Sequence, residues 1–246
     1  MTRVYSGAQN WRAPLMLGLL SILAAMSCSP ARAVPAFAAQ TGQPCQMCHV
    51  GGFGPQLTVY GRNFKLSGYT QRSTPFNVPL SGMGVASYLH TQDDQAPPPD
   101  GFKANDNFAL DQISLFLAGG LGSHLGGFVQ TTYDGIAKAW TWDNLDLRAT
   151  TKVKVKGSDV VLGLSLNNNP TVEDPWNTLA AWGFPYTSSA LAPSPAAAPL
   201  LNGAFAQTSL GLTGYAFFDN TYYLEAGAYG SPSAHTLKSL GADGEP

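Results

Sequence analysis

The chain has 246 residues, of which only 11% are Asp, Glu, Lys or Arg, against roughly 25% in an ordinary soluble protein. Glycine (27 residues), phenylalanine (12) and tyrosine (10) are plentiful, which is typical of a β-protein that presents much of its surface to lipid. The formal net charge of −2 and the lack of a basic cluster argue against nucleic acid as a partner.

The chain begins with the pattern of a secretion signal. Arg3 and Arg12 give it a positive start, Pro14–Met26 is a short apolar run, and Ala31–Ala33 supplies a small-x-small cleavage site. We therefore expect the first 33 residues to be a signal peptide that is removed after export. A retained anchor helix is the alternative, but the apolar run is shorter than the roughly 20 residues of a spanning helix. Lipoprotein processing at Cys28 is a second alternative, disfavoured by the residues that precede this cysteine.

A c-type haem attachment motif follows, at Cys45-Gln46-Met47-Cys48-His49. Two thiols separated by two residues lie about one helical turn apart, which matches the spacing of the two haem vinyl groups. We expect Cys45 and Cys48 to carry the thioether bonds to one covalent haem c. The next residue is then held under the iron, so His49 is expected to be the proximal ligand. Cleavage after Ala33 would leave Cys45 and Cys48 as the only cysteines of the mature chain.

Two other kinds of site use closely spaced cysteines. A redox dithiol belongs in a βαβ context, which the sequence around the motif lacks. Structural zinc needs four ligands, and no second pair of Cys or His follows at a usable spacing. The place of the motif directly behind a secretion signal favours haem, because bacteria attach haem c outside the cytoplasm.

The sequence leaves the sixth ligand of the haem iron open. Met47 lies inside the motif and cannot fold back over the distal face. Met83, His90 and His124 are the other candidates, of which we favour Met83. The alternatives are a packing role for Met83, surface positions for the two histidines, and an open or water-bound iron. The choice matters because a methionine ligand raises the reduction potential relative to histidine.

A short helical stretch after the motif offers further contacts for the cofactor. The candidates for packing against the porphyrin are Phe53, Leu57, Tyr60 and Phe64, and the candidates for pairing with its propionates are Arg62 and Lys65. Ordinary aromatic packing and solvated charges in a helix are the alternative interpretation of these residues.

After this stretch the sequence pattern changes from one typical of helices to an alternation of apolar and polar residues. In one segment, for example, Val153 and Val155 interleave with Lys152 and Lys154. This period of two is typical of strands with one apolar and one more polar face. Most segments approach the roughly 9–11 residues that a tilted membrane strand needs. We expect strands near 81–91, 108–118, 124–134, 140–153, 159–168, 207–218 and 221–230.

The connections between these strands alternate in length. Tight connections are expected at 119–123, 156–158 and 219–220, whereas 92–107 and 169–206 are long. Outer-membrane barrels likewise combine short periplasmic turns with longer outer loops. A soluble β-sandwich, the alternative, would carry more charge on its outward face and would seldom contain such a long loop.

The predicted fold is therefore mainly β: a small helical c-type haem segment followed by a transmembrane antiparallel β-barrel. Seven strands is an odd number, whereas bacterial single-chain barrels use even numbers. The polar stretch Leu240–Pro246 also supplies no closing strand. The barrel is thus expected to be incomplete.

Several short motifs resemble those of a known family. They are Gln40–Gly42, the Cys-x-x-Cys-His motif, Tyr60–Lys65 and Gly68–Thr70 in the haem segment, with Asn167–Val172, Asp174–Asn177 and Trp182–Tyr186 further on. Those of the haem segment resemble the fused outer-membrane monohaem cytochrome c–porins, which include the outer-membrane cytochromes of iron-oxidising bacteria, and the later ones resemble the long loop of a related group of cytochrome–porins. The resemblance implies a haem domain at or inside the mouth of a porin-like barrel. It also implies a truncated member, because the barrel of that family is longer.

The resulting organisation is a signal peptide (1–33), a monohaem cytochrome c segment (34–77) and a partial porin-like barrel (78–246) in the bacterial outer membrane. The leading hypothesis is an electron-transfer protein rather than a conventional enzyme. Its expected partners are outer-membrane lipid, a periplasmic electron carrier and an extracellular electron donor, for which ferrous iron is a candidate. A diffusion porin with a haem-bearing plug or redox sensor is the alternative, and a soluble periplasmic haem protein is a third hypothesis.

Overall fold

The computed structural model describes residues 35–52, 54–75, 79–95, 99–178, 188–193 and 205–242. The chain divides into two compact units, Met1–Arg32 and Ala33–Pro246, and every described residue belongs to the second. The expected signal peptide, Phe53 and Trp182–Tyr186 lie outside the described residues.

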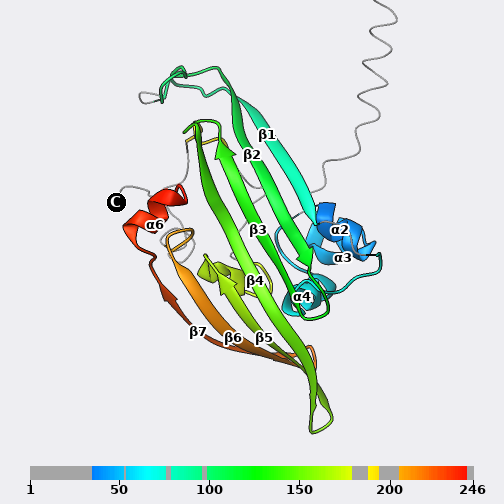
Figure 1. Cartoon of the computed structure of the whole chain (residues 1–246). Coiled ribbons are helices and arrows are strands. Elements are labelled where there is room, and N and C mark those ends of the chain that lie inside the picture. The colour runs from blue at the N-terminus through cyan, green and yellow to red at the C-terminus, as the bar shows by residue number, and fades with distance from the viewer. Residues whose placement is uncertain are drawn as a thin grey trace, which may run out of the picture. The chain divides into compact units, whose positions relative to one another are not determined.

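Seven strands form a single antiparallel sheet in which their order in space is their order in the chain (Figure 1). The strands are β1 (Leu80–Leu89), β2 (Asn107–Gly120), β3 (Leu125–Asp134), β4 (Ala139–Val155), β5 (Ser158–Asn167), β6 (Leu210–Phe218) and β7 (Tyr222–Gly230). All seven predicted strands are confirmed, with ends that differ by at most three residues. Within the described residues β1 and β7 do not pair with each other, so the sheet is open there.

A group of short helices precedes the sheet, as the sequence predicts. They are α2 (Pro35–Thr41), α3 (Cys45–Cys48), η1 (Val50–Gly52) and α4 (Val59–Leu66). The hydroxyl of Thr58 caps α4 by accepting a hydrogen bond from the amide of Gly61 at 3.2 Å. Gly68, with φ +67°, follows the end of α4 in the left-handed conformation that terminates many helices. Two further elements were not predicted, namely η2 (Pro170–Glu173) and α6 (Ala234–Ser239).

Three tight connections lie at one end of the sheet, here called the tight-turn end. They are 121–124 between β2 and β3, 156–157 between β4 and β5, and 219–221 between β6 and β7. Lys156 and Gly157 both have positive φ, which matches the two-residue turn that suits the twist of a hairpin. The sequence predicted this alternation of tight and longer connections.

The helical segment contacts the sheet near this end. The side chain of Gln40, in α2, accepts a hydrogen bond from the amide of Gly120 at 2.8 Å and donates to the carbonyl of Tyr69 at 2.6 Å. The hydroxyl of Thr150, in β4, donates to the carbonyl of Ser67 at 3.1 Å. These bonds hold α2 and the end of α4 against β2 and β4.

The two faces of the sheet have opposite polarity to those of a soluble β-protein, which normally buries its apolar face. The face that the helical segment covers, here called the inner face, buries the polar side chains Ser114, Gln130, Thr132, Asn144, Asp146, Arg148, Thr150, Ser165, Asn167 and Thr213. The outer face exposes Leu80, Phe108, Leu110, Ile113, Leu115, Leu117, Leu125, Leu147, Leu162, Leu164, Leu210, Leu212 and Leu224. The strand periodicity therefore places leucines outward, and it places these polar groups inward beside the aromatic residues that the helices cover.

Aromatic packing joins the helical segment to the inner face. Phe37 stacks on Tyr69, with ring centroids 5.2 Å apart, and meets the edge of Phe64 at 5.1 Å. It also approaches Phe128 of β3 at 6.3 Å. Leu66 of α4 is fully buried beside aromatic residues of β6. These contacts hold α2 and α4, which flank the Cys-x-x-Cys-His motif in the sequence, against the sheet.

Candidate haem-attachment site

The Cys-x-x-Cys-His motif forms a single helical turn. Cys45 and Cys48 are the first and last residues of α3, and both thiols are free and half-buried. His49 follows in an extended conformation, with φ −114° and ψ 135°. Two accessible thiols on one turn, with an imidazole directly after them, are the arrangement that covalent haem attachment requires.

Backbone hydrogen bonds hold this turn in place. His49 pairs with Leu57 in an antiparallel bridge, and the amide of Val50 donates to the carbonyl of Gln56 at 3.0 Å. The amide of Thr58 donates to the carbonyl of Cys48 at 2.9 Å. The position of the cysteines is therefore set by the segment that leads into α4.

Gly61 is where α4 passes closest to the haem motif. A Cβ atom at Gly61 would lie 2.2 Å from the carbonyl oxygen of Cys48, a distance that forces the backbone apart. We therefore expect Gly61→Ala to destabilise the protein by about 2 kcal/mol and to lower the yield of covalent haem.

The haem content of purified Gly61→Ala, measured as the pyridine haemochrome per chain, tests this expectation. Gly84→Ala is the matched control, because a Cβ there meets no atom within 4 Å. Equal haem content and equal unfolding free energy in the two variants would show that the close approach of α4 to Cys48 is unimportant.

Burial shifts the pKa of two side chains of the motif. Burial, and after it the neighbouring Cys45, raises the pKa of Cys48. Burial also lowers the pKa of His49, although the backbone of Gly54 and Pro55 acts in the opposite direction. The imidazole is thus neutral at neutral pH, the form that binds a metal. Its Nδ1 atom is buried and makes no hydrogen bond of ordinary geometry.

Met83, the favoured sixth ligand, packs in an apolar cluster on the inner face. Its side chain contacts the cluster formed by Phe116 and Ala118, which Phe37 of α2 also joins. This is the packing role that the sequence offered as the alternative for Met83. Ligation of iron by Met83 stays a prediction.

The two histidine candidates lie at opposite ends of the sheet. His124 is in the tight turn between β2 and β3, where its Nδ1 lies 2.9 Å from the carbonyl of Thr150, whose hydroxyl donates to Ser67 at the end of α4. His90 follows β1 at the other end, and its Nδ1 lies 2.8 Å from Asp106 in an exposed pair. Of the two, the structure brings His124 to the end of the sheet that carries the helical segment.

The residues expected around the porphyrin divide into two groups. Phe64 is buried in the aromatic cluster with Phe37, so the alternative of ordinary packing holds for it. Leu57 and Tyr60 are only partly buried. Arg62 lies with its guanidinium 5.4 Å from the centre of the Trp176 ring, and its buried Nε makes no hydrogen bond. Pairing of Arg62 with a haem propionate stays a prediction.

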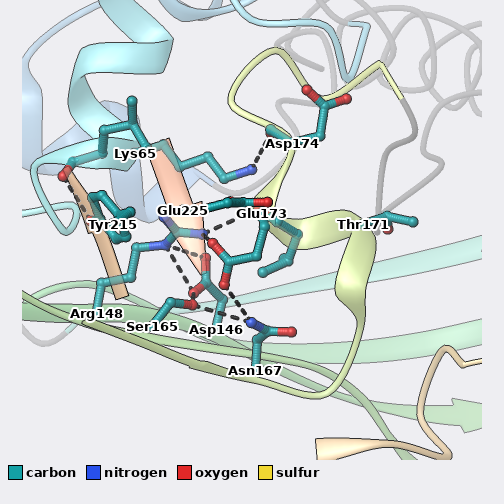
Figure 2. A network of polar contacts seen from close by, with 12 residues as sticks. Lys65, Asp146, Arg148, Ser165, Asn167, Thr171, Glu173, Asp174, Tyr215 and Glu225 are labelled. Carbon is teal, nitrogen blue, oxygen red and sulfur yellow. Dashed lines mark hydrogen bonds and ion pairs between the residues drawn. The ribbon is translucent and has the colours of Figure 1, made fainter. Parts of the chain in front are cut away.

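A buried network of charged groups crosses the inner face beside the helical segment (Figure 2). Nε of Arg148 donates to both carboxylate oxygens of Asp146, at 3.0 and 2.9 Å, and Nη2 donates to Oε2 of Glu173 at 3.3 Å. The side chains of Arg148 and Asp146 are 0% and 1% exposed. The hydroxyl of Tyr69 donates to Asp146 at 2.6 Å. Burial raises the pKa of Glu173, and the Arg148 guanidinium opposes that shift.

Lys65 connects α4 to this network. Its ammonium donates to the carbonyl of Asp174 at 2.8 Å and to Oδ1 of Asn177 at 2.6 Å. The hydroxyl of Tyr215, in β6, donates to the carbonyl of Leu66 at 2.8 Å. The expectation that Lys65 pairs with a propionate is not met, because its side chain is buried and bonded within the protein.

The buried ammonium of Lys65 makes the stability depend on pH. Burial, and after it the neighbouring Arg148, lowers the pKa of Lys65 from 10.5 to about 8. Between pH 8 and 10.5 the unfolded chain therefore holds a proton on Lys65 that the folded chain has lost. The unfolding free energy should rise with pH across this window, by at most about 3 kcal/mol, because the cost of burying the charge disappears.

Denaturation curves recorded between pH 8 and 10.5 for the wild type and Lys65→Met test this expectation. The contributions of groups that titrate in both proteins cancel when the unfolding free energy of the variant is subtracted from that of the wild type. Lys154→Met is the control, because Lys154 is exposed and pairs only with the exposed Asp159 among the ion pairs described. A difference that stays flat would show that folding leaves the pKa of Lys65 unchanged, and one that falls with pH would show that the charged form is the stabilising one.

The network is the part of the site that the sequence reasoning missed. Asp146 and Arg148 alternate with Leu145 and Leu147, so the sequence placed two charged side chains on the face opposite the leucines. Charged residues in a strand expected to span a membrane are a signal of function. Nothing in the sequence context of Glu173 indicates that it folds back onto the sheet.

Comparisons of the chain with protein-family models, with curated proteins and with solved structures give no match. In the described ranges no three His, Cys, Asp or Glu side chains gather so that they could hold a metal ion. No helix in the described part of the chain is both long and apolar enough to cross a membrane. The functional interpretation therefore rests on the geometry of the haem motif and of the sheet.

Proposed function

We propose that this chain is an outer-membrane c-type cytochrome fused to a porin-like barrel, and that it carries electrons between an extracellular donor and a periplasmic carrier. The observation that carries the proposal is the single turn of Cys45, Cys48 and His49, in a helical segment that packs on the inner face of an antiparallel sheet whose outer face is apolar and exposed. The bound haem c would supply a one-electron carrier.

The residues of the chain have separate tasks in this proposal. Cys45 and Cys48 anchor the cofactor covalently, and the neutral imidazole of His49 binds its iron. The bridge between His49 and Leu57 orients the imidazole. No general acid or base is needed, because electron transfer requires only that the cofactor approach each partner.

The polarity of the sheet supports the membrane part of the proposal. Exposed leucines on the outer face include Leu115, Leu164 and Leu212, on three different strands. In water such a surface would be an aggregation site, whereas in lipid it is the expected barrel exterior. The buried charges of Asp146 and Arg148 lie on the opposite face, which suits the inside of a barrel.

Leu164→Lys distinguishes a lipid-facing sheet from a soluble one. In lipid the substitution should lower the unfolding free energy by about 2–4 kcal/mol, because a lysine enters the hydrocarbon region. In a soluble protein it should be nearly neutral, because Leu164 is 54% exposed. The measurement is urea unfolding from lipid vesicles, with Ser158→Lys at the tight turn between β4 and β5 as the control.

The experiment that tests electron transfer uses full-length protein matured with the c-type haem machinery. In liposomes that enclose an electron acceptor, an external donor such as ferrous iron should reduce the acceptor. The His49→Ala protein, reconstituted in the same way, should transfer far fewer electrons. A wild-type protein with covalent haem that fails to reduce the acceptor would refute the conduit.

A diffusion porin is the second candidate, and the polar inner face favours it. Ser114 and Thr132 lie 2.9 Å apart through their hydroxyls, and Asn144 donates to Gln130 at 2.9 Å. Such a surface can line a water-filled channel. Solute flux that is as fast in His49→Ala as in the wild type, together with no electron transfer in either, would select the porin.

A further inference from the structure

The loop that follows β5 is anchored to the inner face of the sheet. Its segment Asn169–Asn177, here called the strap, begins with the η2 turn, which the side chain of Asn169 caps. The side-chain Nδ2 of Asn167 donates to Oε1 of Glu173 at 2.6 Å, and Nη2 of Arg148 donates both to Glu173 and to the neighbouring carbonyl of Val172 at 3.1 Å. Each carboxylate oxygen of Glu173 therefore has a partner on the sheet.

The other end of the strap holds α4. The ammonium of Lys65 reaches two strap residues at once, the carbonyl of Asp174 and the side chain of Asn177. One turn earlier on the same helix, the guanidinium of Arg62 lies over the indole ring of Trp176. Figure 2 shows Lys65 directed from α4 toward the strap, close to the Arg148 network.

The strap also reaches the haem-attachment turn through the backbone. The amide of Leu57 donates to the carbonyl of Trp176 at 2.9 Å. Leu57 is the bridge partner of His49, and the adjacent amide of Val50 donates to Gln56. His49, Leu57 and Trp176 are thus joined side by side in a small array of backbone hydrogen bonds.

From these contacts we propose that the strap is a positioning element of the haem site: it fixes Leu57, and through Leu57 the backbone that orients His49. The effect on haem rests on the proposed function, whereas the effect on the protein backbone does not. A buried ion pair such as Arg148 with Glu173 tolerates little displacement, because a shift would leave charges unpaired away from water. The strap is therefore held in one position, and its hydrogen bond to Leu57 fixes the position of that residue as well.

The first test follows amide hydrogen exchange of the full chain by mass spectrometry, in Cys45→Ser/Cys48→Ser protein that carries no haem. Lys65→Met removes the donor that holds the strap to α4. Asn177→Gly removes the acceptor without a change of charge, and glycine keeps the positive φ of 52° at this position. We expect peptides that cover 45–58 to exchange roughly ten-fold faster in both variants.

Controls separate loss of the strap from loss of the fold. Lys154→Met makes the same substitution at an exposed lysine and should leave exchange of 45–58 unchanged. Peptides from β4 and β5 should exchange as in the wild type. If Lys65→Met unfolds the sheet, the exchange measured in Asn177→Gly decides whether the proposal stands. Unchanged exchange of 45–58 in folded Asn177→Gly would overturn the proposal.

The second test uses haem-loaded protein and reads the iron ligation. Asn177→Gly should keep its covalent haem per chain, while the electron paramagnetic resonance signal of the ferric iron broadens or shifts as the His49 orientation loosens. A merely structural role in stability would leave this signal unchanged in the folded variant. A wild type without covalent haem would refute the proposed function. Hydrogen exchange would still show whether the strap fixes the backbone around His49.

Discussion

Replacing both Cys45 and Cys48 by alanine should abolish covalent haem, because each thiol is expected to form one thioether bond and no other cysteine lies in the described residues. The pyridine haemochrome of protein extracted from outer membranes should fall to background. The α3 turn itself should persist, because its stabilising bonds run through the backbone, including the one from the amide of Thr58 to the carbonyl of Cys48.

The single variants sharpen this expectation. Cys45→Ala should retain one attachment point at Cys48 and give a reduced yield with a shifted haemochrome band. Met47→Leu is the control, because Met47 lies inside the motif, is 42% exposed and has no expected bond to haem. Covalent haem that survives in the double variant would refute the assignment of Cys45 and Cys48 as the attachment residues.

The second large effect is expected at Arg148. Arg148→Met leaves the carboxylates of Asp146 and Glu173 buried without their main cation, and breaking a buried pair on one side costs about 3–5 kcal/mol. The cost arises from the unpaired charges, so it should shrink when Asp146→Asn and Glu173→Gln are added to Arg148→Met. The three buried residues should therefore show strong non-additivity.

Equilibrium unfolding in denaturant measures these costs. Lys152→Met is the matched control on the same strand, because Lys152 is exposed. It should change the unfolding free energy by less than about 0.5 kcal/mol. If Arg148→Met lowers the unfolding free energy no more than Lys152→Met does, the network neither stabilises the fold nor anchors the strap.

The strands were predictable because their signal is local. Alternation of apolar and polar residues identifies a strand without knowledge of its partner, and seven such runs sufficed to give seven strands in sequence order. The helical turn that carries Cys45 and Cys48 was predictable for the same reason, because the motif spans only neighbouring residues. Tight turns such as Lys156-Gly157 carry their own residue preferences.

The network was not predictable, because it depends on register and on a long loop. Asp146 faces Asn167, and Arg148 faces Ser165, only in the register that β4 and β5 adopt. A slip of one residue would turn Arg148 to the outer face. Glu173 joins them because the loop after β5 folds back over the sheet, and no periodicity in the sequence encodes that fold.

The bonds that dock the helical segment connect parts of the chain that are far apart. Lys65 and Asn177 are separated by 112 residues, and Leu66 and Tyr215 by 149. If the chain is exported from its N-terminus, as the proposed function requires, the Cys-x-x-Cys-His motif would reach the periplasm before the residues that hold it. The attachment machinery would therefore meet an undocked motif, and the later arrival of Asn177 and Tyr215 would complete assembly around a cofactor already in place.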